Sequence, residues 1–357
     1  MSKENNLESL RRRIDEIDLK LLELINERVR TAGEIGADKA SRGEGVYRPE
    51  REAQVFSRLI DRNDGPIDDD AVRAIFGEVI SCARSAEAPV RVAALGPRGT
   101  FSEQAAHKVF GRQITLLEAA NIREVFRLTE SGDAQFGVVP VENSTEGGVN
   151  ATLDLLVETT LQVCNEVELR VTHCLLASAN SHNPREIAGH EQALAQCRNW
   201  LATHYAGVPL LPKSSTAEAA RAAAADPEVM AIASPQAATL YELEVRARDI
   251  ADVPGNTTRF QVLSTASPPP SGSDKTSVVT ATSNDAGSLL QLLGPLARAE
   301  ISMTRIESRP TRTGLWKYVF FIDLEGHVAD PKVADALKEI DGASAFLRIL
   351  GSYPRAL

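Results

Sequence analysis

The chain has 357 residues, 43% of them hydrophobic and 25% charged, which is the composition of an ordinary globular protein. That length predicts two or three domains. The formal net charge of -10 argues against nucleic acid as a partner. No apolar run approaches the roughly 18 residues that cross a bilayer, and the polar N-terminus differs from a secretory signal. Four scattered cysteines predict reduced thiols, so we expect a cytoplasmic protein with no membrane partner.

Residues 1–88 carry a pattern typical of helices. The next position of their apolar seam after residue 24 holds a charge, Arg28. A second helix is predicted after Pro49, and a third after the acidic run at 68–70, where carboxylates complement a helix N-terminus. The seam itself follows the a/d positions of a heptad repeat, which predicts a long helix that faces a partner: Leu7, Leu10, Ile14, Ile17, Leu21 and Leu24.

Charged residues stand in this segment where a core is expected. Arg28 and Lys39 lie eleven residues apart, about three turns, so they share one face of the first helix. Arg51 and Glu52 each precede apolar positions by one turn, and Glu87 extends the apolar stripe of the third helix. Buried charges are costly unless they are paired or bind a ligand. The set therefore predicts a pocket for a small polyanion, although any one residue taken singly is better explained by a solvated helix face or an ordinary salt bridge.

Arg11 flanks the same seam but lies about 26 Å along the helix from Arg28. It is too far away to reach the same small ligand from the same straight helix. If Arg11 takes part in the pocket, it must come from a second chain, which predicts an intertwined homodimer.

These residues resemble the signature of the all-helical chorismate mutases, here Leu10-Arg11, Glu27-Arg28, Lys39 and Arg51-Glu52. The resemblance implies chorismate as the substrate, which rearranges to prephenate by confinement and electrostatic stabilisation. It implies that Arg11 of the partner chain, Arg28 and Arg51 hold carboxylates. It also implies that Lys39 contacts the ether oxygen and that Glu52 takes a substrate hydroxyl.

Three further positions of the expected mutase site depart from the commonest pattern of that family. Arg48 stands where an aspartate is often found, Ala83 where a serine can occur, and Glu87 where a glutamine often donates to the ether oxygen. A glutamic acid can make that donation only when it is protonated. The strength of the mutase activity stays open, and a helical segment that serves only dimerisation is the alternative.

Residues 90–267 alternate short apolar runs with helical stretches, the pattern of an α/β domain with ligands at its strand ends. A segment of this length predicts two lobes around a cleft. Hydroxyl and amide side chains follow or begin two runs, in the sequences VPVENSTEGG (139–148) and NTTRF (256–260). Neither offers a metal ligand set or a phosphate loop, and the zinc motif that His190 begins fails because residue 194 is leucine. We therefore expect a site without metal or cofactor that works by hydrogen bonding and placement.

Four motifs of this segment closely resemble prephenate dehydratase, at 96–101, 139–144, 190–197 and 257–260. The resemblance implies a fold like the two-lobed periplasmic binding proteins. It also implies that prephenate in the cleft loses CO2 and its ring hydroxyl to give phenylpyruvate. Thr258 is predicted to donate a hydrogen bond to the leaving hydroxyl, because a threonine is too weak an acid for full proton transfer.

Further residues of the expected dehydratase site follow from the same resemblance. Asn143 and Gln196 are assigned to positioning. Arg259 is predicted to be either a carboxylate anchor or a salt bridge between the lobes. The other predicted contacts are hydroxyls, with a purely structural turn as the alternative for the first: Thr100, Ser144, Thr145, Ser215 and Thr216.

A linker rich in serine and proline is predicted at 267–274, followed by a βαββαβ unit of ferredoxin type at 275–357. Two motifs there, Gly287-Ser288-Leu289 and Glu307-Ser308-Arg309-Pro310, resemble the ligand motifs of ACT regulatory domains. The resemblance implies that L-phenylalanine binds where two such domains pair and acts as an allosteric inhibitor.

The three segments together predict a multidomain, bifunctional enzyme of phenylalanine biosynthesis. Its parts are an all-α mutase bundle, an α/β two-lobed dehydratase domain and an α+β regulatory domain. Two alternatives remain beside the dimerisation segment. One is a small-anion binding or sensing protein, since solute binders share the central fold, and the other is a preference for arogenate over prephenate.

Overall fold

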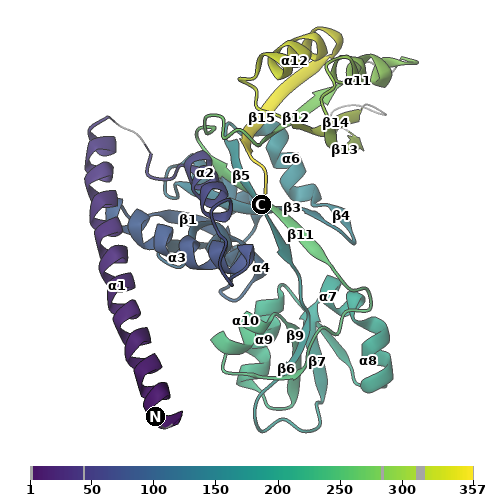
Figure 1. Ribbon diagram of the computed structural model, residues 1–357. Helices are drawn as coiled ribbons and strands as arrows, with labels where there is room; N and C mark the ends of the chain where they lie inside the picture. Colours follow the sequence, from purple (N-terminus) through teal and green to yellow (C-terminus); the bar gives the residue numbers. More distant parts are fainter. Residues whose placement is uncertain (1–2, 43–44, 283–284, 311–317, 357) are drawn as a thin grey trace. The chain divides into compact units, whose positions relative to one another are not determined.

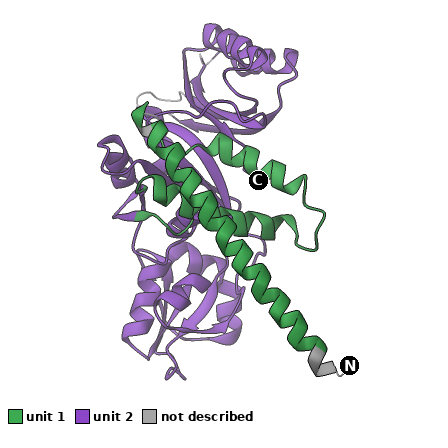
Figure 2. Ribbon diagram, turned by 60° about the vertical axis from the view of Figure 1, so that its left-hand side comes forward, with its two compact units in different colours: residues 1–90, 110–115 green, residues 91–109, 116–357 purple. Residues whose placement is uncertain are grey.

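The structure is a computed structural model that describes residues 3–42, 45–282, 285–310 and 318–356 (Figure 1). The chain divides into two compact units (Figure 2). Unit 1 comprises Met1–Val90 and Phe110–Thr115, and unit 2 comprises Arg91–Val109 and Leu116–Leu357.

Unit 1 contains the three predicted helices, α1 (Lys3–Ser41), α2 (Pro49–Ile60) and α3 (Asp69–Glu87). The predicted acidic start of α3 is confirmed, because the side chain of Asp68 accepts a hydrogen bond from the backbone N–H of Ala71 at 2.8 Å. The C-terminal half of α1 packs along α3, and its N-terminal half projects beyond α2 and α3 (Figure 2).

The apolar seam of α1 is exposed within a single chain. Its six members, Leu7, Leu10, Ile14, Ile17, Leu21 and Leu24, are each between 46% and 60% exposed. A continuous apolar stripe of this size on a monomer's surface is typical of an interface.

Unit 2 begins with a mixed sheet in the order β2-β1-β3-β11-β5, with the short β4 paired to β3. Its core is apolar and includes buried residues of the helices α5 and α6. The strands are β1 (Arg91–Leu95), β2 (Thr115–Ala119), β3 (Phe136–Asn143), β4 (Gly147–Gly148), β5 (Gln162–Arg170) and β11 (Thr257–Ser264). The helices are α4 (Phe101–Phe110), α5 (Ile122–Glu130) and α6 (Asn150–Glu158).

A second sheet, in the order β10-β6-β9-β7-β8, forms the other lobe. The chain passes between the lobes twice, after β5 and before β11, and there Val171 N–H donates to the carbonyl of Asn256 at 2.8 Å. This confirms the two-lobed fold (Figure 1). The strands are β6 (Cys174–Ala177), β7 (Glu186–His190), β8 (Leu210–Lys213), β9 (Val229–Ala233) and β10 (Glu244–Ala247). The helices are α7 (Glu191–Gln196), α8 (Arg198–His204), α9 (Thr216–Ala225) and α10 (Pro235–Leu240).

The third sheet, β13-β14-β12-β15, has the strand order of a ferredoxin-like unit, as predicted. Two helices pack on one face of it. The opposite face contributes Val279, Phe321 and Tyr353 to the core of the first lobe, so the two share one hydrophobic core. The elements are β12 (Asp274–Ala281), α11 (Ser288–Arg298), β13 (Met303–Pro310), β14 (Tyr318–Glu325), α12 (Pro331–Ala343) and β15 (Phe346–Pro354).

The segment predicted as a linker is held in place by hydrogen bonds. The Asp274 carboxylate accepts from the backbone N–H of Ser271 at 2.9 Å and of Gly272 at 3.1 Å. The ring Nε2 of His327 lies 3.1 Å from the carbonyl oxygen of Pro268. These contacts and the shared core explain why the dehydratase-like lobes and the third sheet form one unit.

Candidate active sites

In unit 1 the structure brings four of the predicted charges together from three helices. The Nζ of Lys39 on α1 lies 3.1 Å from a carboxylate oxygen of Glu87 on α3. Arg28 lies about three turns earlier on the same face of α1. Its guanidinium donates to the carbonyl of Val79 at 3.4 Å. Burial lowers the pKa of Arg28, and the carboxylates of Glu52 and Glu87 oppose that shift. The cluster therefore places two cations beside two carboxylates, among partly buried side chains.

Glu52 pairs with a cation that the sequence analysis missed. Its carboxylate accepts a hydrogen bond from the guanidinium of Arg84, a residue only 4% exposed. That guanidinium also lies over the rings of Tyr47, at 5.0 Å, and of Phe110, at 5.7 Å. Burial raises the pKa of Glu52, and the charge of Arg84 opposes the rise. Arg84 is one turn after the buried Ile80, which is the same signal that identified Glu87.

The other predicted mutase residues lie outside this cluster or are already paired. Arg11 is exposed on α1, and Ala83 is buried on α3. The Arg48 guanidinium lies 2.5 Å from the carboxylate of Glu50. The expectation that Arg51 points inward is wrong within one chain, because Arg51 is exposed. Its apolar neighbours on α2 are themselves only half-buried, since one chain leaves that side of α2 uncovered.

In unit 2, Thr258 and Asn143 face each other across adjacent strands. Thr258 on β11 is the register partner of Asn143 at the end of β3. The side-chain amide of Asn143 donates to Thr258 Oγ1 and to Asn256 Oδ1, both at 2.8 Å. Its own oxygen accepts from the backbone N–H groups of Thr145 and Glu146, at 3.0 and 3.3 Å. Because Thr258 Oγ1 accepts from Asn143, its own proton is left to donate.

Gln196, the last residue of α7, joins this group from the second lobe. Its oxygen lies 2.9 Å from both Asn256 Nδ2 and His173 Nε2, and its amide donates to the Glu146 carboxylate at 3.0 Å. The three residues predicted as the dehydratase centre, Thr258, Asn143 and Gln196, therefore lie in one connected hydrogen-bond chain. His173 and Glu146 were not singled out from the sequence, because a lone histidine or acid in a strand-end segment carries no distinguishing pattern.

The predicted hydroxyl contacts are mostly occupied by local structure. Thr100 donates to the carbonyl of Leu95 at 2.8 Å and accepts from Glu103 N–H at 3.3 Å, so its single proton is already used. This is the structural turn that was the alternative for Thr100. Ser215 caps α9 by accepting from Glu218 N–H at 3.0 Å, and Thr216 is the buried first residue of that helix.

Two hydroxyl residues lie beside the amide chain. Ser144 accepts from Thr257 N–H at 3.0 Å and lies 3.4 Å from Asn256 Oδ1. Thr145 is exposed, and its backbone N–H donates a hydrogen bond to the side-chain oxygen of Asn143. Ser144 and Thr145 thus shape the turn that holds Asn143.

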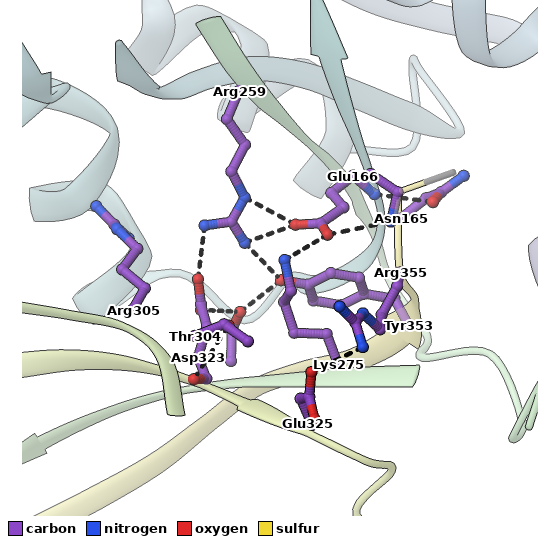
Figure 3. Close-up of polar contacts among 12 residues, drawn as sticks. Asn165, Glu166, Arg259, Lys275, Thr304, Arg305, Asp323, Glu325, Tyr353 and Arg355 are labelled. Carbon is purple, nitrogen blue, oxygen red and sulfur yellow. Dashed lines mark hydrogen bonds and ion pairs between the residues drawn. The ribbon is translucent and has the colours of Figure 1, made fainter. Parts of the chain in front are cut away.

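Arg259 is not the carboxylate anchor that was one of its two predicted roles. Successive side chains of a strand point to opposite faces, so Arg259 points away from the face of Thr258. Its guanidinium donates to Glu166 at 2.7 Å, to Asp323 at 2.6 Å and to the phenol of Tyr353 at 3.1 Å (Figure 3). Burial alone would lower the pKa of Arg259, but these three partners raise it above its usual value. Arg259 therefore joins β11 to the third sheet, not lobe to lobe.

The second motif of the third sheet lies directly against the first lobe. Glu307 on β13 pairs with Arg305, whose Nε lies 2.9 Å from the carboxylate of Glu142, the neighbour of Asn143. A Cβ on Gly148 would clash with the Glu307 carboxylate, so this glycine permits close approach to Glu307. Arg309 donates to the carbonyl of Asn150 at 2.9 Å.

The remaining residues of the two regulatory motifs belong to element ends. Gly287 has a left-handed φ of 87° and caps α11, which begins at Ser288. Leu289 is 37% exposed. Ser308 and Pro310 are exposed on β13.

Two features are absent from the described residues, a membrane-spanning helix and a cluster of metal-binding side chains. No helix among residues 3–42, 45–282, 285–310 and 318–356 is long and apolar enough to span a bilayer. The same part of the chain holds no group of three or more histidine, cysteine, aspartate or glutamate side chains placed to bind a metal ion.

The fold and the two polar clusters define a multidomain enzyme with a ferredoxin-like third module. Family profiles match each part: chorismate mutase type II over residues 10–88, prephenate dehydratase over 92–268 and the ACT domain over 278–342.

Whole-chain comparisons identify the family. The chain is 45% identical to the bifunctional chorismate mutase/prephenate dehydratase of Pseudomonas aeruginosa over 364 residues, covering 100% of both chains. It is 44% identical to the protein of that name from Neisseria gonorrhoeae, covering 97% of this chain and 96% of the relative. The chain belongs to the family of bifunctional chorismate mutase/prephenate dehydratases.

A solved structure supports the assignment of unit 2. The prephenate dehydratase of Arthrobacter aurescens in complex with L-Phe is 38% identical, with a TM-score of 0.69. The similarity covers 75% of this chain and 90% of that one.

Proposed function

We propose that this enzyme rearranges chorismate to prephenate in the helical domain and converts prephenate to phenylpyruvate in the two-lobed domain. The domains are residues 1–88, 90–267 and 275–357. The observation that carries the proposal is the pairing of a charged cluster in unit 1 with an uncharged hydrogen-bond chain around Thr258 in unit 2.

The charged cluster suits the first reaction. Chorismate is a dicarboxylate, and its rearrangement needs a compact conformation and stabilisation of the ether oxygen as its bond breaks. Arg28 would hold a carboxylate and Lys39 would donate to the ether oxygen, while Glu52 takes the ring hydroxyl. Glu87 is paired with Lys39 here and would exchange that contact for the substrate, with Arg48 and Arg51 at the rim. Confinement and charge placement supply the rate enhancement.

The uncharged chain suits the second reaction. The bond to the ring carboxylate of prephenate breaks, its electron pair enters the ring, and the ring hydroxyl departs. The products are phenylpyruvate, CO2 and a hydroxide that takes a proton from solvent. Thr258 would keep its proton and donate a hydrogen bond to the departing oxygen, since Asn143 already donates to Thr258 Oγ1. Aromatisation supplies the driving force, so hydrogen-bond assistance suffices without metal or cofactor.

The exposed seam of α1 supports a homodimer as the working form. Pairing of two α1 helices would bury the six seam residues and bring Arg11 of one chain to the cluster of the other. The same dimer would cover the exposed side of α2, where Arg51 lies.

L-phenylalanine is the proposed allosteric inhibitor, bound at the 287–289 and 307–310 motifs. The Glu307–Arg305–Glu142 contacts link one of these motifs to the strand of Asn143. We further infer a cytoplasmic location, which the four free cysteines favour.

The direct test is incubation of the full chain with chorismate while phenylpyruvate is followed by absorbance. We expect phenylpyruvate to accumulate and added L-phenylalanine to suppress it. Accumulation of prephenate alone would exclude the dehydratase, whereas turnover of prephenate without turnover of chorismate would leave unit 1 as a dimerisation segment. Arogenate offered in parallel reports the preference between the two substrates.

A further inference from the structure

The hydrogen-bond chain around Thr258 has a fixed direction. Each side-chain amide can be turned by half a rotation, which exchanges its donor and its acceptor. At one end, two backbone N–H groups point at Asn143 Oδ1. They can only donate, so they hold the amide of Asn143 with its nitrogen toward Thr258.

The other end of the chain is held by two residues outside the predicted site. The Glu146 carboxylate can only accept when ionised, and it lies 3.0 Å from the nitrogen of Gln196. The ring Nε2 of His173 lies 2.9 Å from the oxygen of Gln196. Turning the Gln196 amide would place its oxygen against the carboxylate and its nitrogen against the donating Asn256 Nδ2.

The burial of His173 fits the hydrogen bond that its ring makes with Gln196. It is 3% exposed, and its Nδ1 has no hydrogen-bond partner among the described residues. A neutral ring with its proton on Nε2 satisfies the contact with Gln196 and leaves only an unprotonated Nδ1 buried. Burial lowers the pKa of His173, which favours that neutral form.

We propose that His173 and Glu146 are positioning residues that orient the Gln196 amide, and that this orientation passes through Asn256 and Asn143 to aim the Thr258 proton into the cleft. The inference rests on the proposed dehydratase function. Both residues act through Gln196, and neither needs to contact the reacting atoms.

The hydrogen-bond chain around Thr258 also takes its residues from both lobes. Asn143, Asn256 and Thr258 belong to the first lobe and its crossover segment, whereas Gln196 belongs to the second. His173 lies on the other crossover segment, just before β6. The hydrogen-bond chain is therefore complete only when Gln196 of the second lobe meets Asn256, which couples the meeting of the lobes to the full support of the Thr258 hydroxyl.

The test measures prephenate turnover by the full chain in four variants. His173→Leu removes the donor and should lower kcat about tenfold with little change in KM, the effect of one lost hydrogen bond in the transition state. His173→Gln keeps an N–H at a similar position and should restore most of kcat. Glu146→Ala should resemble His173→Leu. Because both residues orient one amide, the double variant should lose much less than the product of the single losses.

Two controls separate this inference from instability and from the proposed function. His327→Leu removes an equally buried histidine of the third sheet, 5% exposed, and should leave kcat unchanged without phenylalanine. Chorismate consumption by the same variants reports that unit 1 is folded, and recovery of kcat in His173→Gln reports the same for unit 2. If the wild type lacks dehydratase activity, the proposed function fails. If the wild type is active and His173→Leu matches it or matches His173→Gln, or if the single losses multiply, this inference alone fails.

A measurement of the tautomer gives an independent reading. With 15N-labelled histidine, NMR of the full chain should show a neutral His173 ring protonated at Nε2 and bare at Nδ1. A ring protonated at Nδ1 would overturn the proposed direction of the chain.

Discussion

The two candidate sites of this chain are completed in opposite ways. The cluster of unit 1 consists of charges, and in one chain they pair with each other while Arg11 and Arg51 remain exposed. The group around Thr258 consists mainly of neutral amides and hydroxyls, with the His173 ring and the Glu146 carboxylate at one end, and unit 2 supplies all of them from one chain. In the proposed homodimer a second chain completes the first site, whereas the second site draws all of its residues from one chain.

The difference follows from the substrate chemistry that each site serves. A dianion that must be folded into a compact shape needs several cations around it, and two chains supply more directions than one. A substrate that becomes aromatic by losing CO2 needs one well-placed donor. Buried neutral groups cost less than buried charges when they bond to each other, so they can be held in advance of the substrate.

The largest expected effect is a loss of dehydratase activity with the mutase activity kept. Thr258→Val should lower dehydration of prephenate by about 10³-fold, the range for loss of a positioned donor, and leave chorismate turnover unchanged. Steady-state rates with each substrate check this. Thr257→Val is the matched control, because its hydroxyl donates to the carbonyl of Gly255 instead and its rate should stay near wild type. Retained dehydration in Thr258→Val would remove this residue from the mechanism.

Disrupting the apolar seam of α1 should have the opposite effect, a loss of mutase activity with the dehydratase activity kept. Ile14→Glu with Leu21→Glu places carboxylates in the proposed dimer interface, where burying them is costly. Chorismate turnover should fall on the order of 100-fold, because each site loses the partner's charge, while prephenate turnover persists. Sedimentation should show smaller particles. Lys20→Glu, a carboxylate off the heptad positions, should keep both activities, and a mutase that survives the seam change would show that one chain suffices.

The two sites differ in how much of each could be predicted from the sequence. Charges on apolar stripes are conspicuous, so Arg28, Lys39, Glu52 and Glu87 were predicted before their convergence was seen. A second chain was also predicted, from the distance between Arg11 and Arg28 along α1. The exposure of Arg51 was not predicted, because Arg51 faces inward only if another chain covers α2. The ferredoxin-like order was predictable from alternation alone.

The sequence does not predict polar side chains that are buried inside strands. β5 was not predicted, because Glu166 interrupts its apolar pattern, and only the structure shows that Arg259 and Lys275 neutralise it. His173 and Glu146 lie outside the strands and were missed because a single histidine or acid near a strand end has no distinguishing pattern. A hydrogen-bond chain joins residues up to 115 positions apart, and no local spacing reports it.

A smaller effect is expected when the contacts between the regulatory motif and the first lobe are removed, because inhibition should weaken while both catalytic activities stay near normal. Arg305→Leu removes the link between Glu307 and Glu142. We expect the phenylalanine concentration for half-inhibition to rise about tenfold with uninhibited dehydration near normal, since only the coupling is lost. Arg298→Leu, which breaks an exposed pair with Glu339 in the same domain, is the control. Unchanged inhibition in Arg305→Leu would exclude this route.

The smallest effect concerns stability and pH. The folded state lowers the pKa of His173, so it favours the neutral ring. That contribution is present above the unfolded pKa of about 6.5 and is lost as the pH falls through the lower folded value. Denaturant unfolding should therefore show that the wild type loses more stability on acidification than His173→Gln does. Parallel curves for the two proteins would show that this ring does not titrate as described.

Mixing two inactive mutases tests the contrast between the sites most directly. Arg11→Ala and Arg28→Ala should each abolish chorismate turnover and leave dehydration intact. After the two proteins are unfolded together and refolded, half of the dimers would be mixed, and one site in each would be whole. We predict recovery of about a quarter of the wild-type mutase rate. No recovery, with mixed dimers present, would contradict a site shared between chains.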